Sequence, residues 1–306
     1  MQDDQFSRTS LATAFFRAHH TEQEGEPIFA DPLARRLIGE EAYAKLAAHF
    51  SQALAQFAPE RAAQCPDPAS ALDLSMRLMG APAVVLCRTR FAEERLELAM
   101  ARGVRQYVIL GAGMDTFAWR RPDLLAAGLS VLEIDHPATQ AFKRQRLEAA
   151  GMAIPAGLHF LPVDLSRQGL AEALADSAFD PRTPAVVCWL GVTYYLTRQE
   201  VLATLGAIAR VAAIGSEAVF DYADAQAQLS QGDAKRRQML RDRVSRVGEP
   251  MRGGLDSASL ATDLAGLGLR LEEDWDHEEI KRRYLAGRPD GMRIGGHPHL
   301  ARVAVA

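Results

Sequence analysis

Cysteine, long apolar runs and a dominant charge are all scarce in this chain of 306 residues. The cysteines Cys65, Cys87 and Cys188 are scattered and form no C-x-x-C pair, which excludes a disulfide framework or a cysteine zinc site. The histidines also lack zinc-ligand spacing, so we expect no metal. A net charge of -4 predicts no general attraction to nucleic acid or to an anionic membrane.

Targeting and membrane signals are absent as well. The chain opens with Met1-Gln2-Asp3-Asp4 instead of a basic segment and a long apolar segment. No stretch approaches the roughly 18 apolar residues of a spanning helix. With 48% hydrophobic and 24% charged residues, the composition is that of a globular protein, which we expect in the cytoplasm.

The sequence pattern changes near residue 86, where an Ala-rich helical region gives way to short apolar strands separated by helices. In the first region, Asp31 predicts a helix N-cap with Pro32 at the first helical position. We divide the chain into an N-terminal helical cap (1–85), a ligand-binding core (86–222), a helical insert or lid (223–254), and a last helix with closing strands (255–306).

Alternating strands and helices predict a mainly parallel sheet that is covered on both faces. A final pair of strands predicts an antiparallel hairpin at one edge. The expected fold is therefore α/β and Rossmann-like, with a seven-stranded sheet, an N-terminal helical cap and a helical insert. The expected strands are 106–110, 129–135, 159–164, 185–190, 217–222, 269–273 and 299–305.

A glycine turn and a following acid mark the expected ligand site. The strand ending at Leu110 runs into Gly111-Ala112-Gly113, where the backbone can approach a ligand closely. Asp135 ends the next strand, at the spacing where an acid binds both hydroxyls of a ribose. Asp115 and Thr116 occupy positions where a pyrophosphate and a third glycine would be expected, which disfavours NAD(P) and favours a nucleoside ligand without phosphate.

Five short motifs follow one another between residues 88 and 196. They are Arg88-Thr89-Arg90-Phe91, Val108 to Thr116, Glu133-Ile134-Asp135-His136-Pro137, Val163-Asp164-Leu165 and Gly191-Val192-Thr193-Tyr194-Tyr195-Leu196. Together they resemble the leucine carboxyl methyltransferase family, and within it the bacterial branch that includes polyketide carboxyl O-methyltransferases. The resemblance implies a class I methyltransferase that uses S-adenosylmethionine and methylates a carboxylate of a small molecule or natural product.

The resemblance also implies how the methyl donor is held. Arg88 would bind the donor's carboxylate, a task suited to a planar guanidinium. The other implied contacts are the backbone at Gly111 and Gly113 for the amino-acid end, Asp135 for the ribose, and Asp164 with Leu165 for the adenine. Leu190 departs from the family, whose members commonly carry an acid there, because leucine cannot accept a hydrogen bond from the donor's ammonium group.

Three functions remain open on the sequence alone: the methyltransferase, a cofactor-binding protein of the same fold without catalysis, and an NAD(P)-dependent oxidoreductase. A carboxylate acceptor is already ionised at neutral pH and needs no base. A hydroxyl acceptor would need one, and His136 is the candidate beside a motif.

The acceptor side is less defined by motifs. Tyr194 and Trp119 are expected as walls of the acceptor pocket, and Arg252 as the group that holds an acidic acceptor. We expect the N-terminal helices, the insert and the loop 248–252 to form a lid over the carboxyl ends of the strands. The basic residues between 235 and 246 predict a solvated helix face paired with neighbouring acids; the alternative is a surface that docks an acidic substrate or carrier domain.

Overall fold

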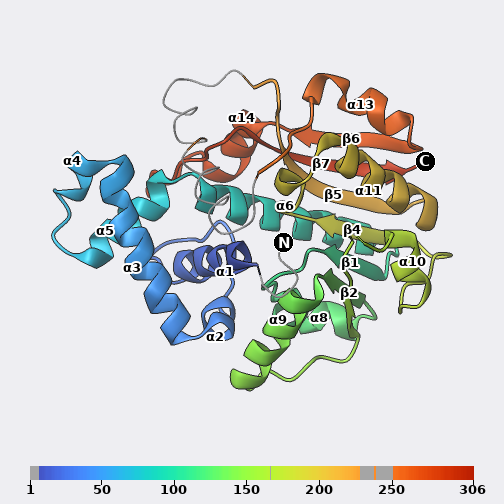
Figure 1. Cartoon of the computed structure of the whole chain (residues 1–306), viewed down its shortest axis with the longest axis horizontal. Helices are drawn as coiled ribbons and strands as arrows, with labels where there is room; N and C mark the ends of the chain where they lie inside the picture. The colour runs from blue at the N-terminus through green and yellow to red at the C-terminus, as the bar shows by residue number, and fades with distance from the viewer. Residues whose placement is uncertain (1–6, 166, 228–237, 239–250) are drawn as a thin grey trace.

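The computed structural model describes residues 7–165, 167–227, 238 and 251–306, and its centre is one seven-stranded sheet (Figure 1). The strand order is β3-β2-β1-β4-β5-β7-β6. The first five strands of the chain are parallel, and β7 pairs antiparallel with both β5 and β6. The strands are β1 (Gln106–Leu110), β2 (Ser130–Asp135), β3 (Leu158–Pro162), β4 (Ala185–Trp189), β5 (Glu217–Ala223), β6 (Leu269–Trp275) and β7 (Pro298–Val305).

Helices cover both faces of the sheet because its central strands are apolar on both sides. One core joins α6 and α14 to one face, and a second joins α10, α11 and α13 to the other. The helices of the core are α6 (Ala81–Ala101), α7 (Phe117–Arg120), α8 (Pro122–Ala126), α9 (Pro137–Ala149), α10 (Leu170–Ala175), α11 (Arg198–Val211), α13 (Ser257–Ala265) and α14 (His277–Ile280), with the 3₁₀-helix η1 (Thr193–Tyr195) and the π-helix η2 (Lys281–Leu285).

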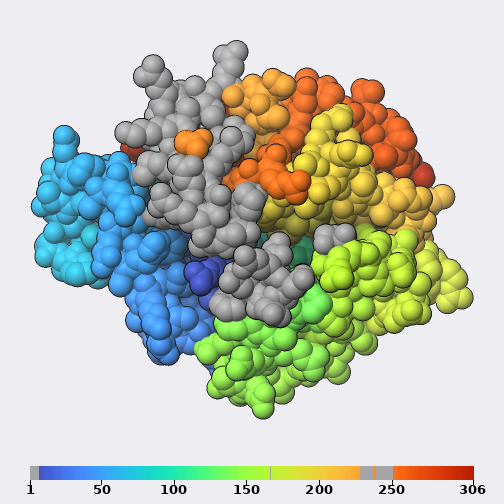
Figure 2. Space-filling model, in the orientation of Figure 1, coloured from blue at the N-terminus to red at the C-terminus, as the bar shows by residue number. Residues whose placement is uncertain are grey.

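The N-terminal helices pack together at one side of the sheet, and Figure 2 shows α3 to α5 projecting at the left of the molecule. A third apolar cluster, which includes Phe15, Phe50 and Met76, holds this group together. The helices are α1 (Arg8–Thr21), α2 (Ala34–Ile38), α3 (Glu40–Phe57), α4 (Pro59–Ala62) and α5 (Pro68–Leu78).

The expected α/β fold is confirmed, including the antiparallel strands at the C-terminal edge. The boundary placed at residue 85 falls inside α6, which connects the N-terminal helices to the sheet. Most of the expected insert (223–254) lies outside the described residues. Among those described, no single helix is long and apolar enough to cross a membrane, although α5 and α6, bent by 61° at their junction, pass the same test as a pair.

Strand order reverses between β1 and β4, since β2 and β3 lie on one side of this point and β5 on the other. In open parallel sheets, ligands bind outside the carboxyl ends of the strands at such a reversal. The glycine turn after β1 and the segment after β4 meet here. The fold therefore brings the predicted motifs to one edge of the sheet.

Candidate functional site

The glycine turn after β1 is tightly fixed. Gly111 and Gly113 have φ angles of 72° and 51°, which favour glycine. A Cβ at Gly111 would lie 2.5 Å from Cγ2 of Val192, and one at Gly113 would lie 2.9 Å from Cβ of Ser10 in α1. Both glycines are thus needed for packing as well as for the turn, and their contact with a ligand stays a prediction.

Asp135 is the last residue of β2 and is hydrogen-bonded to that turn. Its Oδ2 accepts a hydrogen bond from the Gly113 N–H at 2.5 Å, and its Oδ1 accepts one from the His136 N–H at 2.6 Å. Burial raises the pKa of Asp135, although both backbone bonds oppose the shift. Each carboxylate oxygen has a second lone pair. The carboxylate is therefore oriented by the backbone and keeps acceptor capacity for a ribose.

Arg88 of α6 points to the end of β4 and β5. Its Nη1 donates to Oδ2 of Asp221 at 2.9 Å, with the Asp221 side chain fully buried and that of Arg88 12% exposed. Gly191, with φ 72°, leaves space for the guanidinium, because a Cβ there would lie 2.4 Å from Nη2 of Arg88. The glycine after β4 therefore forms a cradle for the predicted donor-binding arginine.

Asp221 joins Arg88 to the segment after β4. Its Oδ1 accepts from the Gly191 N–H at 2.6 Å, and its Oδ2 accepts from the Tyr194 hydroxyl at 2.9 Å. Burial raises the pKa of Tyr194, so the hydroxyl stays a donor. Leu190, at the position where the family commonly carries an acid, packs against the core beside α6. Asp221 supplies a carboxylate from the neighbouring strand at this end of the sheet.

The predicted adenine contacts follow β3. Leu165 is 39% exposed and so presents apolar surface that a ring could cover. Oδ2 of Asp164 lies 3.9 Å from Nε2 of His136. Nδ1 of His136 accepts from the Ala138 N–H at 3.3 Å and caps α9. The structure therefore gives His136 a capping role.

The N-terminal helices are fastened to the glycine turn by a buried charge network centred on Asp31. Its Oδ2 accepts from Nε of Arg17 at 2.8 Å and from the Thr116 hydroxyl at 2.7 Å. Arg17 also donates to the carbonyl oxygen of Met114 at 2.7 Å. Asp31 also accepts from the backbone at the start of α2, but that helix begins at Ala34, so the predicted first position at Pro32 is wrong.

The predicted acceptor-side residues are dispersed. Tyr194 lies in the Asp221 cluster, whereas Nε1 of Trp119 donates to the carbonyl oxygen of Ala153 at 2.7 Å on the α9 side. The Arg252 N–H donates to the carbonyl oxygen of Tyr194 at 3.0 Å, which places its main chain beside the site. Its guanidinium points to Glu200, with 3.5 Å between Nη1 and Oε1.

Sequence reasoning missed Asp221 and the role of Asp31. The sequence did indicate a role for Asp221, because an acid inside the apolar strand of residues 217–222 needs a hydrogen-bonding or charged partner when it is buried. The Asp31 network joins segments far apart in the chain, which no local pattern predicts. The part of the expected insert between residues 223 and 250, including the basic stretch 235–246, falls almost entirely outside the described residues.

Comparison with known proteins identifies relatives along nearly the whole chain. Residues 10–209 match the leucine carboxyl methyltransferase family. YktD of Bacillus subtilis is 33% identical over 293 residues, which cover 95% of each chain. A Parafrankia protein is 31% identical over 284 residues, covering 92% of this chain and 83% of its own. Both are named "Putative S-adenosyl-L-methionine-dependent methyltransferase".

Solved structures share the fold at low sequence identity. A DUF574 family protein from Streptomyces avermitilis has a TM-score of 0.56 at 12% identity, covering 96% of this chain and 97% of its own. A protein from Thermobifida fusca, described as a "putative methyltransferase", has a TM-score of 0.56 at 13% identity and covers 89% and 92%. These likenesses support the architecture and carry no residue roles.

Proposed function

Because this chain belongs to the leucine carboxyl methyltransferase family, we propose that it transfers a methyl group from S-adenosylmethionine to a carboxylate of a small molecule or natural product. S-adenosylmethionine-dependent methyl transfer follows from the family and its relatives. The carboxylate acceptor is the part that we propose. The observation that supports it best is at His136, the base candidate beside a motif, because its Nδ1 already accepts from the Ala138 N–H and caps α9, whereas a carboxylate acceptor needs no base.

The residues at the carboxyl edge fit the donor in charge and shape. Arg88, fixed by Asp221 at one nitrogen, keeps further N–H groups for the donor's carboxylate. Asp135, oriented by two backbone N–H groups, would accept from the ribose hydroxyls. The exposed face of Leu165 would contact the adenine. The cradle at Gly191, which a Cβ would fill, supports this assignment.

The donor, when bound, supplies a methyl group activated by the positive charge of a sulfonium. The chain must then align an acceptor oxygen with that group and exclude water. A carboxylate is ionised at neutral pH and requires no base. This agrees with the capping role of His136, whose Nδ1 is already engaged by the Ala138 N–H. Packing of Ser10 against Gly113 covers the glycine turn and helps to keep water out.

A mass-spectrometric screen tests the proposal. The purified protein is incubated with S-adenosylmethionine and a panel of aromatic and aliphatic carboxylic acids, each paired with the corresponding alcohol. We expect a gain of one methyl group and release of S-adenosylhomocysteine with acids and not with alcohols. Methylation of the alcohols alone would overturn the carboxylate assignment. Calorimetry with S-adenosylmethionine and with NAD separately tests the donor.

A further inference from the structure

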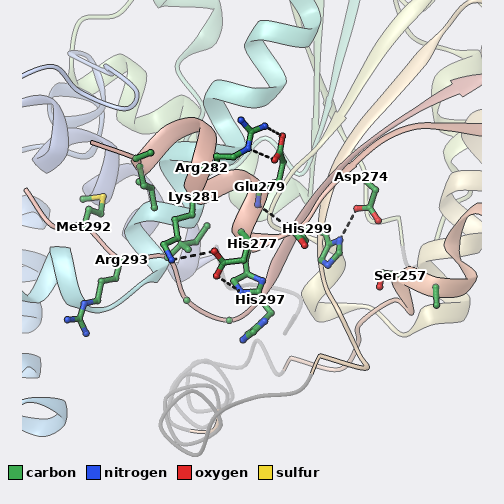
Figure 3. A pocket seen from close by; sticks show the side chains of 18 residues that line it. Ser257, Asp274, His277, Glu279, Lys281, Arg282, Met292, Arg293, His297 and His299 are labelled. Carbon is green, nitrogen blue, oxygen red and sulfur yellow. Dashed lines mark hydrogen bonds and ion pairs between the residues drawn. The ribbon is translucent and has the colours of Figure 1, made fainter. Parts of the chain in front are cut away.

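A cavity of about 1330 Å³ opens at the carboxyl edge of the sheet, beside the end of β6 and the start of β7 (Figure 3). Its walls come from the start of α13, the end of β6, α14 and the loop 292–297. Pockets for drug-sized ligands usually span about 300–1,000 Å³. The cavity therefore has room for a molecule of that size, and none of the motifs assigned to the donor lines it.

Three side chains form a hydrogen-bonded cluster at the cavity wall. The Tyr222 hydroxyl donates to Oδ2 of Asp274 at 2.7 Å, and Nδ1 of His299 lies 2.9 Å from Oδ1 of Asp274. The rings of Tyr222 and His299 stack at 4.7 Å between centroids. Burial raises the pKa of Tyr222, which keeps its hydroxyl a donor. The cluster thus fixes the imidazole by one edge.

The hydrogen bond to Asp274 determines which ring nitrogen of His299 can accept a hydrogen bond from a ligand. Asp274 is an acceptor, so Nδ1 of His299 carries the proton and Nε2 carries the lone pair in the neutral ring. Among the described residues, none forms a hydrogen bond or ion pair with Nε2. Asp274 and His299 both line the cavity, and the Asp274 side of the ring is occupied (Figure 3). Nε2 is therefore the ring atom available to accept a hydrogen bond there.

Much of the remaining charge in the cavity wall is already paired. Glu278 pairs with His277 and Lys281, at 3.3 and 3.4 Å, and Glu279 pairs with Arg282 at 2.5 Å. Leu285, Met292 and Ile294 add apolar surface to the same wall. A ligand of mixed character fits this lining, with an apolar body and a polar group directed at His299.

The cavity lies close to the donor side of the edge. Asp221, which holds Arg88, and Tyr222, which holds His299, are consecutive residues at the end of β5. Their side chains point to opposite faces of the sheet. The loop 292–297 packs on the start of α6, since a Cβ at Gly80 would lie 2.8 Å from the Gly295 N, and Arg88 lies roughly 12 Å further along that helix. A small molecule in the cavity can therefore extend along α6 toward Arg88.

We propose that this cavity binds the body of the methyl acceptor, and that Nε2 of His299 accepts a hydrogen bond from a hydroxyl at the end of the acceptor remote from its carboxylate. This inference rests on the proposed function, because it takes the reacting group to be a carboxylate placed at the donor's methyl group. It names the acceptor class as hydroxycarboxylic acids with an apolar body, such as hydroxycinnamic acids.

Binding of two matched acids tests the assignment. Calorimetry on the complex with S-adenosylhomocysteine compares 4-hydroxycinnamate with cinnamate, which lacks only the hydroxyl. We expect the hydroxylated acid to bind about tenfold more tightly, the equivalent of one good hydrogen bond. His299→Phe should remove this preference and leave cinnamate binding unchanged. His299→Gln, whose amide oxygen can still accept, should keep part of it.

His277→Phe is the matched control, since His277 lines the same cavity without contacting the Asp274 cluster, and it should keep the full preference. Unchanged affinity for S-adenosylhomocysteine reports that each variant is folded. Equal binding of the two acids, binding of neither, or a preference that survives His299→Phe would overturn the inference. Methyl esters formed equally from both acids would discard the role of His299 and keep the proposed function. Selective binding without ester formation would support the pocket and count against the carboxylate proposal.

Discussion

The two halves of the sheet's carboxyl edge are built in different ways. In the donor half, at β1 to β5, the predicted residues other than Arg88 end a strand or follow one closely, as Asp135 and Gly111 do. In the acceptor half, at β6 and β7, the polar groups come from distant segments, as Asp274 and His299 do. The residues expected to bind the donor, whose shape is constant, are positioned by short spacings within the sequence. The residues expected to bind the acceptor, whose shape can vary, are brought together by tertiary packing.

The halves also differ in how deeply their carboxylates are buried. Asp221 is fully buried against Arg88, whereas the side chains of Asp274 and His299 are 17% and 10% exposed. A buried charge that loses its partner is strongly destabilising. We therefore expect the donor half to contribute more to stability than the acceptor half, which can vary with the acceptor.

Removal of the two carboxylates provides the largest expected contrast. Asp221→Ala leaves the Arg88 guanidinium without its buried partner and should lower the free energy of unfolding by about 3 kcal/mol or more. Asp274→Ala removes a less buried acceptor and should cost about 1–2 kcal/mol. Urea denaturation of both variants measures the difference. Equal losses would remove the distinction between the two halves.

Donor affinity should depend mainly on Asp135. Asp135→Ala should weaken binding of S-adenosylhomocysteine by about 1–3 kcal/mol, since a pair of ribose hydroxyls would lose its acceptor. Calorimetry measures this loss. Asp123→Ala, a change at an acid that is 60% exposed and outside the edge, serves as the control. An unchanged affinity in Asp135→Ala would show that the ribose is held elsewhere.

These effects bear on how far the sequence alone predicts the site. Strand–turn–acid spacing predicts the fold and brings Gly113 and Asp135 together, because both follow neighbouring parallel strands. The same reasoning finds Arg88 only through family resemblance, since an arginine inside a long helix has no local signature. His299 and Asp274 meet through antiparallel pairing of β6 with β7. No spacing rule links them, which explains why the cavity was not predicted.

The geometry of the donor-binding arginine can be tested more finely. Arg88→Lys keeps the charge but loses the planar fork, so affinity for S-adenosylhomocysteine should fall about tenfold. Methylthioadenosine lacks the amino-acid tail and should bind the variant as it binds the unaltered protein. Arg90→Lys is the matched control. A loss confined to Arg90→Lys would reassign the carboxylate contact, and equal losses for both ligands in Arg88→Lys would indicate a structural role.

Donor binding should also depend on pH through Asp135. Burial raises the pKa of its carboxyl, so protonation begins at a higher pH than for an ordinary aspartate. The ionised form accepts from both ribose hydroxyls, and protonation removes part of that capacity. Affinity for S-adenosylhomocysteine should therefore be constant near neutral pH and fall as the pH is lowered through the raised pKa. Asp135→Asn should bind more weakly and without that dependence; a parallel decline in the variant would assign the titration to another group.

Arg252 should give the smallest effect on stability and the finest test of the acceptor half. Its side chain is 52% exposed and pairs with Glu200 at 3.5 Å, and exposed ion pairs contribute about 0–1 kcal/mol. Arg252→Ala should thus barely change unfolding, as should Arg198→Ala, a similarly exposed control. If Arg252 turns from Glu200 to hold an acidic acceptor, its loss should raise the acceptor KM several-fold, unlike the control. A structure with S-adenosylhomocysteine decides the point. A guanidinium more than about 12 Å from the sulfur lies beyond the reach of one small ligand and would remove Arg252 from the site. His299 would then remain as the acceptor-side contact.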